Sequence, residues 1–375
     1  MSVCKKICVF MAFSLLFTVI PINVSGASEP SVSAQSAMLI DSDSGTVLFS
    51  KSPDIPLPMA STTKIMTAVV IIETCDLDAI VNIPSEAVGI EGSSIYLCAN
   101  ERLTVRQLLY ALLLSSANDA ATALAIFAAG SVEKFASKMN ATAERLGLYD
   151  SHFDNPHGLD SKDHYTTARD LAKLTSYALT LREFGDIVST YKESIPSADS
   201  QNARVLINHN KLLKTYSGCI GVKTGFTKKS GRCLVSAARR NGITLIAVTL
   251  DAPDDWNDHI KMLDHGFQNY SLKKLTDRSQ FISLPVISGS SNTVICAPRN
   301  DVKALLSALH GPITCQIEMY PFAYAPIEYG EKMGRIVYFC DGKEIGSSDM
   351  IALNNVYLKK QKYTLIDKLK AMLSK

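Results

Sequence analysis

Residues 231–250, GRCLVSAARRNGITLIAVTL, contain two apolar runs that meet at Asn241-Gly242. The runs, Cys233–Ala238 and Ile243–Leu250, have the length and the residue types of β-strands. Asn-Gly is the preferred dipeptide of a two-residue hairpin turn, because both residues adopt positive φ readily. The stretch therefore predicts an antiparallel pair of strands.

Strand patterns also occur at Cys219–Val222 and in residues 37–50, where two apolar runs flank a glycine-containing turn. Between them, apolar residues recur at helical spacing in Val105–Leu114, Asp119–Ala129, Val132–Leu146 and Thr167–Leu179. Ser61–Glu73 is apolar on nearly all sides, which is typical of a buried helix. The simplest packing is one antiparallel sheet, built from both ends of this region, with helices against it. The predicted fold class is therefore α+β.

The composition changes at residues 272–282, and short β-like stretches follow with Gly, Pro and Asn between them. This pattern predicts a small all-β domain at residues 280–356. Residues 357–375 form a lysine-rich segment with five apolar side chains on one helical face: Leu365, Ile366, Leu369, Met372 and Leu373. Such a helix can lie in a membrane interface or pack on its own domain.

Residues 1–26 have the features of a secretory signal peptide. Lys5 and Lys6 precede the apolar run Ile7–Ile20, and small residues follow it. A membrane span needs about 20 apolar residues, so a permanent anchor here would be short. We expect a secreted chain that works outside the cytoplasm, in the cell envelope. Cysteines of such a chain can pair or remain as small core residues.

The overall composition limits the function classes. Of 375 residues, 47% are hydrophobic and 20% are charged, as in globular proteins. The 38 basic and 36 acidic residues give a net charge of +2, which is too balanced for a nucleic-acid-binding domain. Only the N-terminal run approaches the length of a membrane span, so a multi-span membrane protein is excluded.

Three short motifs can carry chemistry. Ser61-Thr-Thr-Lys64 opens the predicted buried helix, and a hydroxyl and an amine one turn apart lie on the same face. Ser-x-x-Lys spacing recurs elsewhere in the chain, so the context singles out this copy. Ser116-Ala-Asn118 lies between two predicted helices, and Lys223-Thr-Gly225 ends a predicted strand before Phe226.

A serine hydroxyl is a weak nucleophile and needs an adjacent base. The seven histidines form no Ser-His-Asp pattern, which leaves Lys64 as the candidate base, and only its neutral form can act. Lowering a lysine pKa from about 10.4 to about 7.5 requires roughly 4 kcal/mol of destabilisation of the ammonium. Burial or a second nearby cation can supply that.

Ser-x-x-Lys, Ser-x-Asn and Lys-Thr-Gly, in this order, are the signature of penicillin-recognising serine enzymes. The chain resembles the D-alanyl-D-alanine carboxypeptidase family of low-molecular-mass penicillin-binding proteins over residues 33–270. Further matching segments are Ala60–Thr67, Asn155–Leu159, Asn208–Leu213, Gly221–Thr227 and Ala252–Trp256. The resemblance implies a penicillin-binding protein/β-lactamase-like transpeptidase fold, with a catalytic domain at residues 27–275.

The resemblance also implies an activity and a role for each site residue. The enzyme would remove the terminal D-alanine from peptidoglycan stem peptides ending in D-Ala-D-Ala, through an acyl-serine, and would bind β-lactams as inhibitors. Ser61 would be the nucleophile, Lys64 its base and Ser116 a proton shuttle. Substrate would contact Asn118, Lys223, Thr224, Gly225 and Phe226, with Lys223 also the second cation near Lys64. The backbone N–H groups of Ser61 and Phe226 would bind the oxyanion, and neither a metal nor a cofactor is implied.

Three other functions stay open. A serine β-lactamase shares the fold and the motifs, but the class A enzymes use a glutamate for deacylation, and residues 155–160 offer none. A DD-endopeptidase uses the same chemistry on crosslinked stems. A non-catalytic wall-binding module has no need for intact motifs. One departure from the family is Ala117, where many members have glycine.

Several other polar residues have ordinary structural explanations. His157 and His164 are expected to anchor loops. The only tryptophan, Trp256, is expected to pack against its neighbours. Residues 254–259 contain Asp254, Asp255, Asp258 and His259, for which we expect a solvated loop and helix cap rather than a metal cluster.

Overall fold

The computed structural model describes residues 29–198, 203–276 and 278–360. The first region, residues 29–269, is built on a five-stranded antiparallel sheet in the order β2-β1-β9-β8-β7. Its strands are β1 (Ser36–Asp41), β2 (Val47–Lys51), β7 (Cys219–Thr227), β8 (Gly231–Arg240) and β9 (Ile243–Leu250). Strands from both ends of the region form one sheet, as predicted.

The β8–β9 hairpin forms at the predicted place. Arg240 pairs with Ile243, and the two residues between them are left-handed, with φ of 51° at Asn241 and 80° at Gly242. Every residue of β9 is buried. Successive residues of the sheet face different cores, as with Leu234 on one side and Val235 on the other. The sheet is therefore covered on both faces.

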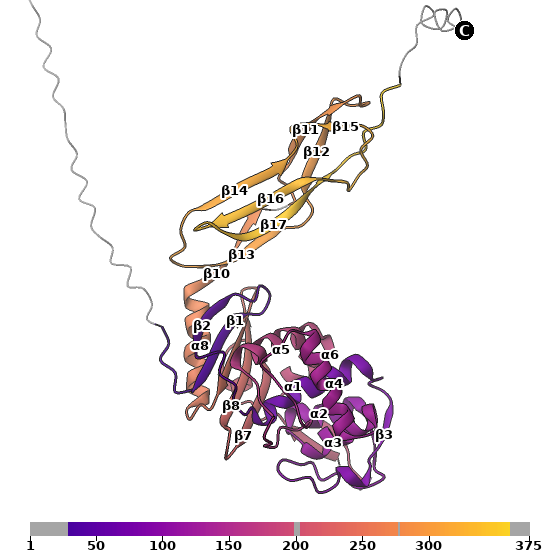
Figure 1. Ribbon diagram of the computed structural model, residues 1–375, viewed down its shortest axis with the longest axis vertical. Helices are drawn as coiled ribbons and strands as arrows, with labels where there is room; N and C mark the ends of the chain where they lie inside the picture. Colours follow the sequence, from indigo (N-terminus) through magenta and orange to yellow (C-terminus); the bar gives the residue numbers. More distant parts are fainter. Residues whose placement is uncertain (1–28, 199–202, 277, 361–375) are drawn as a thin grey trace, which may run out of the picture.

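A helical layer covers one face (Figure 1). It comprises α1 (Lys64–Thr74), α2 (Val105–Leu114), α3 (Asn118–Ala129), α4 (Val132–Arg145), α5 (Ala168–Thr180) and α6 (Arg182–Ser189). Five of these were predicted to within two or three residues. Short elements complete the layer: η1 (Ala60–Thr63), η2 (Ser85–Ala87), and the two-stranded pairs β3 (Ile80–Asn82) with β4 (Arg102–Thr104) and β5 (Lys192–Pro196) with β6 (Ala203–Ile207). The short helix α7 (Leu212–Thr215) lies on the other side of the sheet, where Leu212 is part of the second core.

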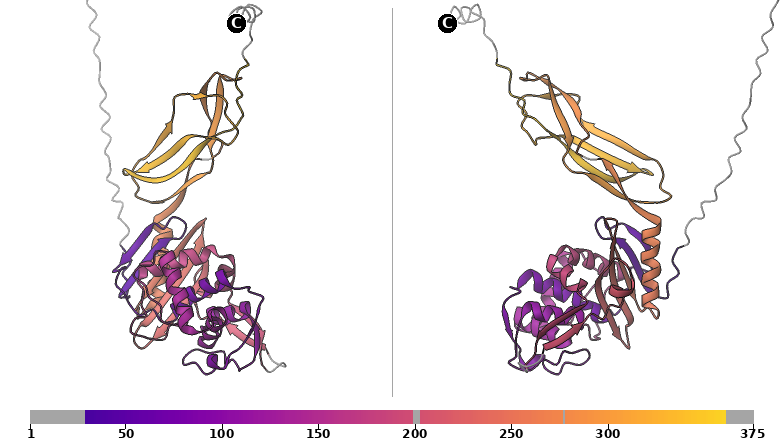
Figure 2. Two further views of the ribbon diagram at one scale, coloured as in Figure 1. Left: turned by 45° about the vertical axis from the view of Figure 1, so that its right-hand side comes forward. Right: turned by 180° about the vertical axis from the view of Figure 1, so that it is seen from behind.

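Helix α8 (Asp255–Asn269) covers the opposite face of the sheet (Figure 2). The expectation of a solvated loop at its start was wrong for Asp255, Asp258 and His259, which are all buried. Asp258 accepts hydrogen bonds from the backbone N–H groups of Ser33 (2.9 Å) and Ala34 (3.0 Å). His259 bonds the hydroxyls of two sheet residues. Asp258 and His259 therefore connect helix α8 to residues 33–34 and to the sheet.

A separate all-β region follows α8. Strand β10 (Tyr270–Thr276) pairs with β13 (Val302–Ser307), and a six-stranded sheet has the order β14-β16-β17-β12-β11-β15. Its strands are β11 (Ile282–Ile287), β12 (Thr293–Pro298), β14 (Ile313–Met319), β15 (Ala323–Tyr324), β16 (Lys332–Cys340) and β17 (Lys343–Ala352). The sequence did not predict β10, because most of its side chains are exposed and it lacks an apolar alternation.

Two sequence predictions concern parts that lie outside the described residues. These are the signal peptide at residues 1–26 and most of the amphipathic segment, residues 361–375. The described part of the chain contains no helix with the length and apolar character needed to cross a membrane. Its seven cysteines are free thiols, and only Cys233, Cys296 and Cys340 are buried.

Candidate functional site

Ser61 lies on the 3-10 turn η1, directly before α1, rather than in the α-helix itself. The preceding residue, Ala60, is held in the left-handed region with φ of 46°. The Thr63 hydroxyl donates to the Ala60 carbonyl (2.7 Å) and lies 2.7 Å from His164 Nε2. Since His164 Nδ1 accepts from the Asp154 N–H (3.0 Å), Nε2 carries the proton and donates to Thr63. Burial lowers the His164 pKa to about 4, so the imidazole ring that bonds Thr63 is neutral at neutral pH.

Lys64 is fully buried at the start of α1, and its amine makes three short contacts. Nζ lies 2.9 Å from Ser61 Oγ, 2.7 Å from Asn118 Oδ1 and 2.6 Å from the carbonyl oxygen of His157. Burial holds the Lys64 pKa well below the ordinary lysine value, and the charge of Lys223 lowers it further. Burial and a nearby cation, the two causes considered from the sequence, therefore both lower the Lys64 pKa.

These three contacts determine how the neutral amine is oriented. A neutral amine has two N–H donors and one lone pair, whereas the Asn118 and His157 oxygens can only accept. With the donors directed to those two oxygens, the lone pair is left for the Ser61 hydroxyl. The geometry thus favours a hydrogen bond in which Ser61 donates to Lys64.

The Ser116–Asn118 motif connects α2 and α3. Ser116 is left-handed, with φ of 57°, and Ala117 is fully buried. Besides its contact with Lys64, Asn118 donates through Nδ2 to the Glu91 carbonyl (2.6 Å). Its amide is therefore held from both sides, and its oxygen remains directed at the lysine.

The Lys-Thr-Gly motif lies inside β7, which continues to Thr227; the prediction that the motif ends the strand was wrong. A Cβ added at Gly225 would lie 3.0 Å from the backbone nitrogen of Ser61 and 3.2 Å from the Met59 carbonyl oxygen. Glycine is thus required here for the strand to approach the turn that carries Ser61. In the order of the five strands, β7 is an edge strand and pairs only with β8.

Lys223 is 1% exposed, and its Nζ donates to the carbonyl of Thr224 (2.9 Å). Burial lowers its pKa to about 7. Lys223 therefore carries a partial positive charge at neutral pH. Its charge disfavours protonation of Lys64, as the cause of the lowered Lys64 pKa indicates.

A cleft of about 320 Å³ brings the three motifs together. Ser61, Ser116, Thr224, Gly225 and Phe226 all line it. Trp256 also lines the cleft and is only partly buried, so it contributes to the site as well as to packing. Ser93, His209 and Arg232 also line the cleft and were not predicted as site residues, although His209 lies in the family-like segment Asn208–Leu213.

The sequence also missed the contribution of the loop at residues 155–160. The His157 carbonyl, rather than its ring, contacts Lys64. Gly158 has φ of 89°, and a Cβ there would lie 2.0 Å from the Ala60 carbonyl oxygen, so only glycine fits. The type of a residue does not show which backbone carbonyl will contact Lys64. Gly158 could, however, have indicated a close approach of this loop to another backbone segment. Among the described residues, no group of three or more His, Cys, Asp or Glu side chains is arranged to hold a metal.

Comparison with known proteins gives consistent results for both regions. The family model for D-alanyl-D-alanine carboxypeptidase matches residues 23–254, and the model for the C-terminal domain of penicillin-binding protein 5 matches residues 270–358. The chain is 33% identical to D-alanyl-D-alanine carboxypeptidase DacF of Bacillus subtilis over 336 residues, which cover 87% of this chain and 86% of that one. It is 31% identical to the D-alanyl-D-alanine endopeptidase of Escherichia coli over 229 residues, covering 60% and 74% of the two chains.

Among solved structures, penicillin-binding protein 5 from Haemophilus influenzae superposes with a TM-score of 0.73 at 29% identity. The match covers 88% of this chain and all of that one. The expected fold, a penicillin-binding protein domain followed by an all-β domain, is confirmed. The chain belongs to the D-alanyl-D-alanine carboxypeptidase family and is a serine hydrolase of that family.

Proposed function

We propose that Ser61 is the nucleophile and Lys64 its general base in the removal of the terminal D-alanine from peptidoglycan stem peptides. The observation that carries this proposal is the buried Lys64 amine 2.9 Å from Ser61 Oγ, with its other contacts to two acceptor oxygens. Lys64 accepts the hydroxyl proton as the Oγ–C bond forms. Positioned proton transfer of this kind contributes about 10²–10⁴ in rate.

The tetrahedral intermediate needs two donors for its oxyanion, and the backbone N–H groups of Ser61 and Phe226 are the proposed pair. Both residues line the same cleft, and Gly225 allows β7 to approach the Ser61 backbone closely. Loss of one such donor costs about 10²–10³ in rate. The C–N bond then breaks, and Ser116 relays the proton to the leaving D-alanine amine. Water cleaves the acyl-serine in the second half of the reaction, and Lys64 again takes the proton.

Substrate recognition is assigned to Asn118 and the Lys-Thr-Gly strand. As an edge strand, β7 has free backbone groups that can pair with an extended peptide. Thr224 lines the cleft, and the partial charge of the adjacent Lys223 attracts the terminal carboxylate of the stem. A β-lactam carries a carboxylate and an acylating carbonyl, and so acts as an inhibitor at the same place.

The test is to follow the intact mass of residues 27–375 with benzylpenicillin and to measure D-alanine release from a tripeptide ending in D-Ala-D-Ala. We expect a lasting adduct of one drug molecule, which is absent in Ser61→Ala, together with D-alanine release. Rapid penicillin turnover without a lasting adduct indicates a β-lactamase. Cleavage of crosslinked stems in preference to the tripeptide indicates an endopeptidase. A folded chain with no adduct and no turnover is a binding module.

We also propose that the chain acts outside the cytoplasm and rests on the outer face of the membrane through its C-terminal segment. The basis is the sequence alone: a signal-like segment at residues 1–26 and the lysine-rich apolar pattern at residues 357–375. Removal of residues 361–375 is expected to abolish sedimentation with anionic vesicles and to leave penicillin acylation unchanged. Equal sedimentation with and without those residues contradicts this placement.

A further inference from the structure

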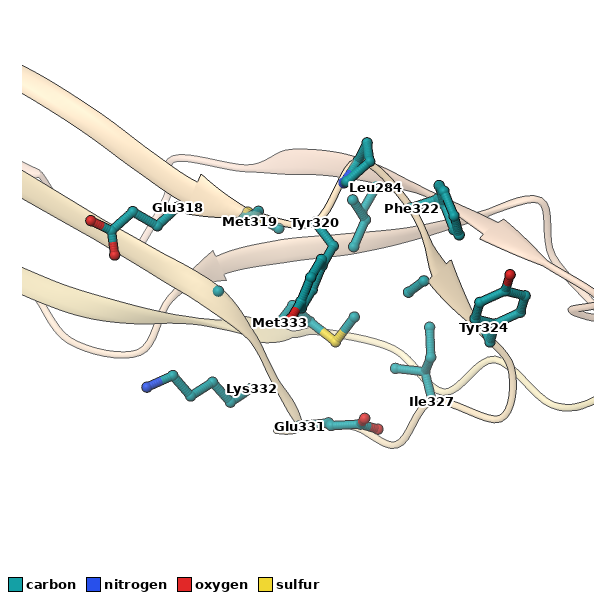
Figure 3. A pocket seen from close by; sticks show the side chains of 13 residues that line it. Leu284, Glu318, Met319, Tyr320, Phe322, Tyr324, Ile327, Glu331, Lys332 and Met333 are labelled. Atoms are coloured by element: carbon teal, nitrogen blue, oxygen red, sulfur yellow. The ribbon is translucent and has the colours of Figure 1, made fainter.

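The all-β region contains a larger and more apolar hollow than the catalytic cleft, which we name the tip groove (Figure 3). Its volume is about 1000 Å³. Apolar side chains dominate its walls: Leu284, Met319, Phe322, Tyr324, Ile327 and Met333. Leu284 and Ile327 are buried beneath it, whereas Phe322 is 41% and Tyr324 67% exposed. A mostly apolar hollow of this volume is within the range of ligand-binding pockets.

The chain leaves the described structure beside this groove. Val356 exchanges both backbone hydrogen bonds with Ile327, at 2.9 Å each, and Ile327 is part of the groove wall. The Lys359 N–H then bonds the Ser288 carbonyl, one residue beyond the strand that pairs with Tyr324. Figure 1 shows this exit at the end of the region remote from the catalytic sheet. The next 15 residues therefore start within a few residues of the groove.

That segment has the pattern of a ligand for such a groove. Leu365, Ile366, Leu369, Met372 and Leu373 fall on one helical face. A helix over these nine residues is about 13 Å long. An amphipathic helix that lays its apolar face in an apolar groove is a common mode of recognition. The link from Val356 to Leu365 spans up to about 30 Å when extended, which is ample for the segment to fold back.

The charges around the groove agree with this occupant. Three charged residues, Glu318, Glu331 and Lys332, line it, and Lys332 is paired with Asp349 at 2.6 Å. Within the described ranges, neither glutamate forms an ion pair. The segment supplies Lys362, Lys368, Lys370 and Lys375 against a single acid, Asp367. The groove is thus locally acidic, and the segment is basic.

We infer that the tip groove is the docking site of the chain's own C-terminal segment, residues 361–375. The apolar face of the segment fills the groove, and its lysines face Glu318 and Glu331. A second consequence rests on the membrane association proposed above. The same apolar face cannot lie in the groove and in a bilayer at once, so docking competes with membrane binding.

The docking itself is tested by a carbodiimide, which joins a carboxylate to a lysine amine as an amide with loss of water. Residues 27–375 in dilute solution are treated, digested and analysed by mass spectrometry. We expect amides between Glu318 or Glu331 and a lysine of residues 361–375. The variant Glu318→Gln/Glu331→Gln should lose them, whereas the matched control Glu328→Gln/Glu344→Gln, with both changes at exposed acids outside the groove, should keep them.

An equal mixture of unlabelled and ¹⁵N-labelled chain separates docking within a chain from docking on a second copy. Amides confined to one chain support the inference. Absence of such amides, or amides only between labelled and unlabelled chains, overturns it. Neither result depends on catalytic activity, so failure here leaves the proposed function untouched.

The competition is tested with vesicles of phosphatidylcholine and phosphatidylglycerol. In Phe322→Ser/Tyr324→Ser the groove loses exposed aromatic walls, and we expect the vesicle-bound fraction to rise by about threefold or more, because the undocked population grows. The control Leu309→Ser/Tyr329→Ser removes exposed apolar groups elsewhere in the region and should leave binding unchanged. A melting temperature and a circular dichroism spectrum like those of the wild type verify that the all-β region of each variant is folded. Unchanged or weaker binding of the groove variant overturns the competition.

Discussion

Gly225→Ala tests whether the close approach of β7 to the Ser61 turn aligns the proposed reaction. The added Cβ would lie 3.0 Å from Ser61 N, 3.1 Å from Ala60 Cβ and 3.2 Å from Met59 O. Gly225 does not have a positive φ, so the effect is steric. The contacts are mostly with backbone, which cannot rotate away, and the strand or the turn must move by a few tenths of an ångström.

The magnitude follows from the cost of overpacking a tight contact, about 1–3 kcal/mol. If this cost falls on the transition state, the acylation rate decreases about 5- to 150-fold, since each 1.36 kcal/mol is a factor of ten. The assay is the second-order rate of acylation by benzylpenicillin, measured beside the melting temperature. Gly185→Ala is the matched control, because nothing lies within 4 Å of a Cβ at that helical position.

We expect the control to acylate at the wild-type rate. Acylation of Gly225→Ala within twofold of wild type would refute the alignment argument, whatever happens to the melting temperature. A lower melting temperature with normal acylation would mean that the strain is absorbed by the fold rather than at the oxyanion donors.

Three further predictions concern the polar groups. In Lys223→Met the cation that lowers the Lys64 pKa is lost, so the Lys64 pKa rises and the acid limb of the acylation–pH profile moves to higher pH; an unmoved limb contradicts the coupling. Asn118→Ala removes the 2.7 Å acceptor of Lys64 and the 2.6 Å anchor to the loop before α2. We expect slower acylation and a loss of about 1–3 kcal/mol in unfolding free energy, measured by denaturant; unchanged stability would speak against that anchor. Asp258→Asn puts an NH₂ group opposite the N–H donors of Ser33 and Ala34, and should lower the melting temperature while acylation stays within twofold of wild type. A parallel loss of acylation would mean that this contact also supports the cleft.

The sequence was most informative where local pattern and tertiary role coincide. The Asn241-Gly242 turn and the fully buried β9 gave the hairpin, since both signals are local. The all-apolar α1 marked a buried helix for the same reason. The exposed strand β10 could not be found this way, because its partner β13 lies beyond two intervening strands and most of its side chains are exposed.

The residues of the site also fall into two groups, those that the sequence indicates and those that only the fold reveals. Side-chain motifs indicated Ser61, Lys64, Ser116 and Lys223, which the fold gathers at one cleft or just behind it. The His157 carbonyl could not be predicted, because every residue carries a carbonyl and only the fold decides which one faces the lysine. The buried acids at the start of α8 were misjudged, since sequence alone does not reveal that Asp258 receives backbone donors from residues 33–34.

The order of strands in the catalytic sheet has a consequence for a chain that is still being made. Strand β1 lies between β2 and β9, with Ala37 opposite Thr249, so its second edge has no partner until the chain has been synthesised to about residue 250. Pairing of such distant segments is slow, because the intervening loop must close before any contact forms. Ser61 and Lys64 are synthesised early, yet β7, which lies against the Ser61 turn, follows much later. A nascent chain therefore carries the proposed nucleophile before the strand that lies against its turn, and on the proposed mechanism we expect no acylation until β7 has been made and paired.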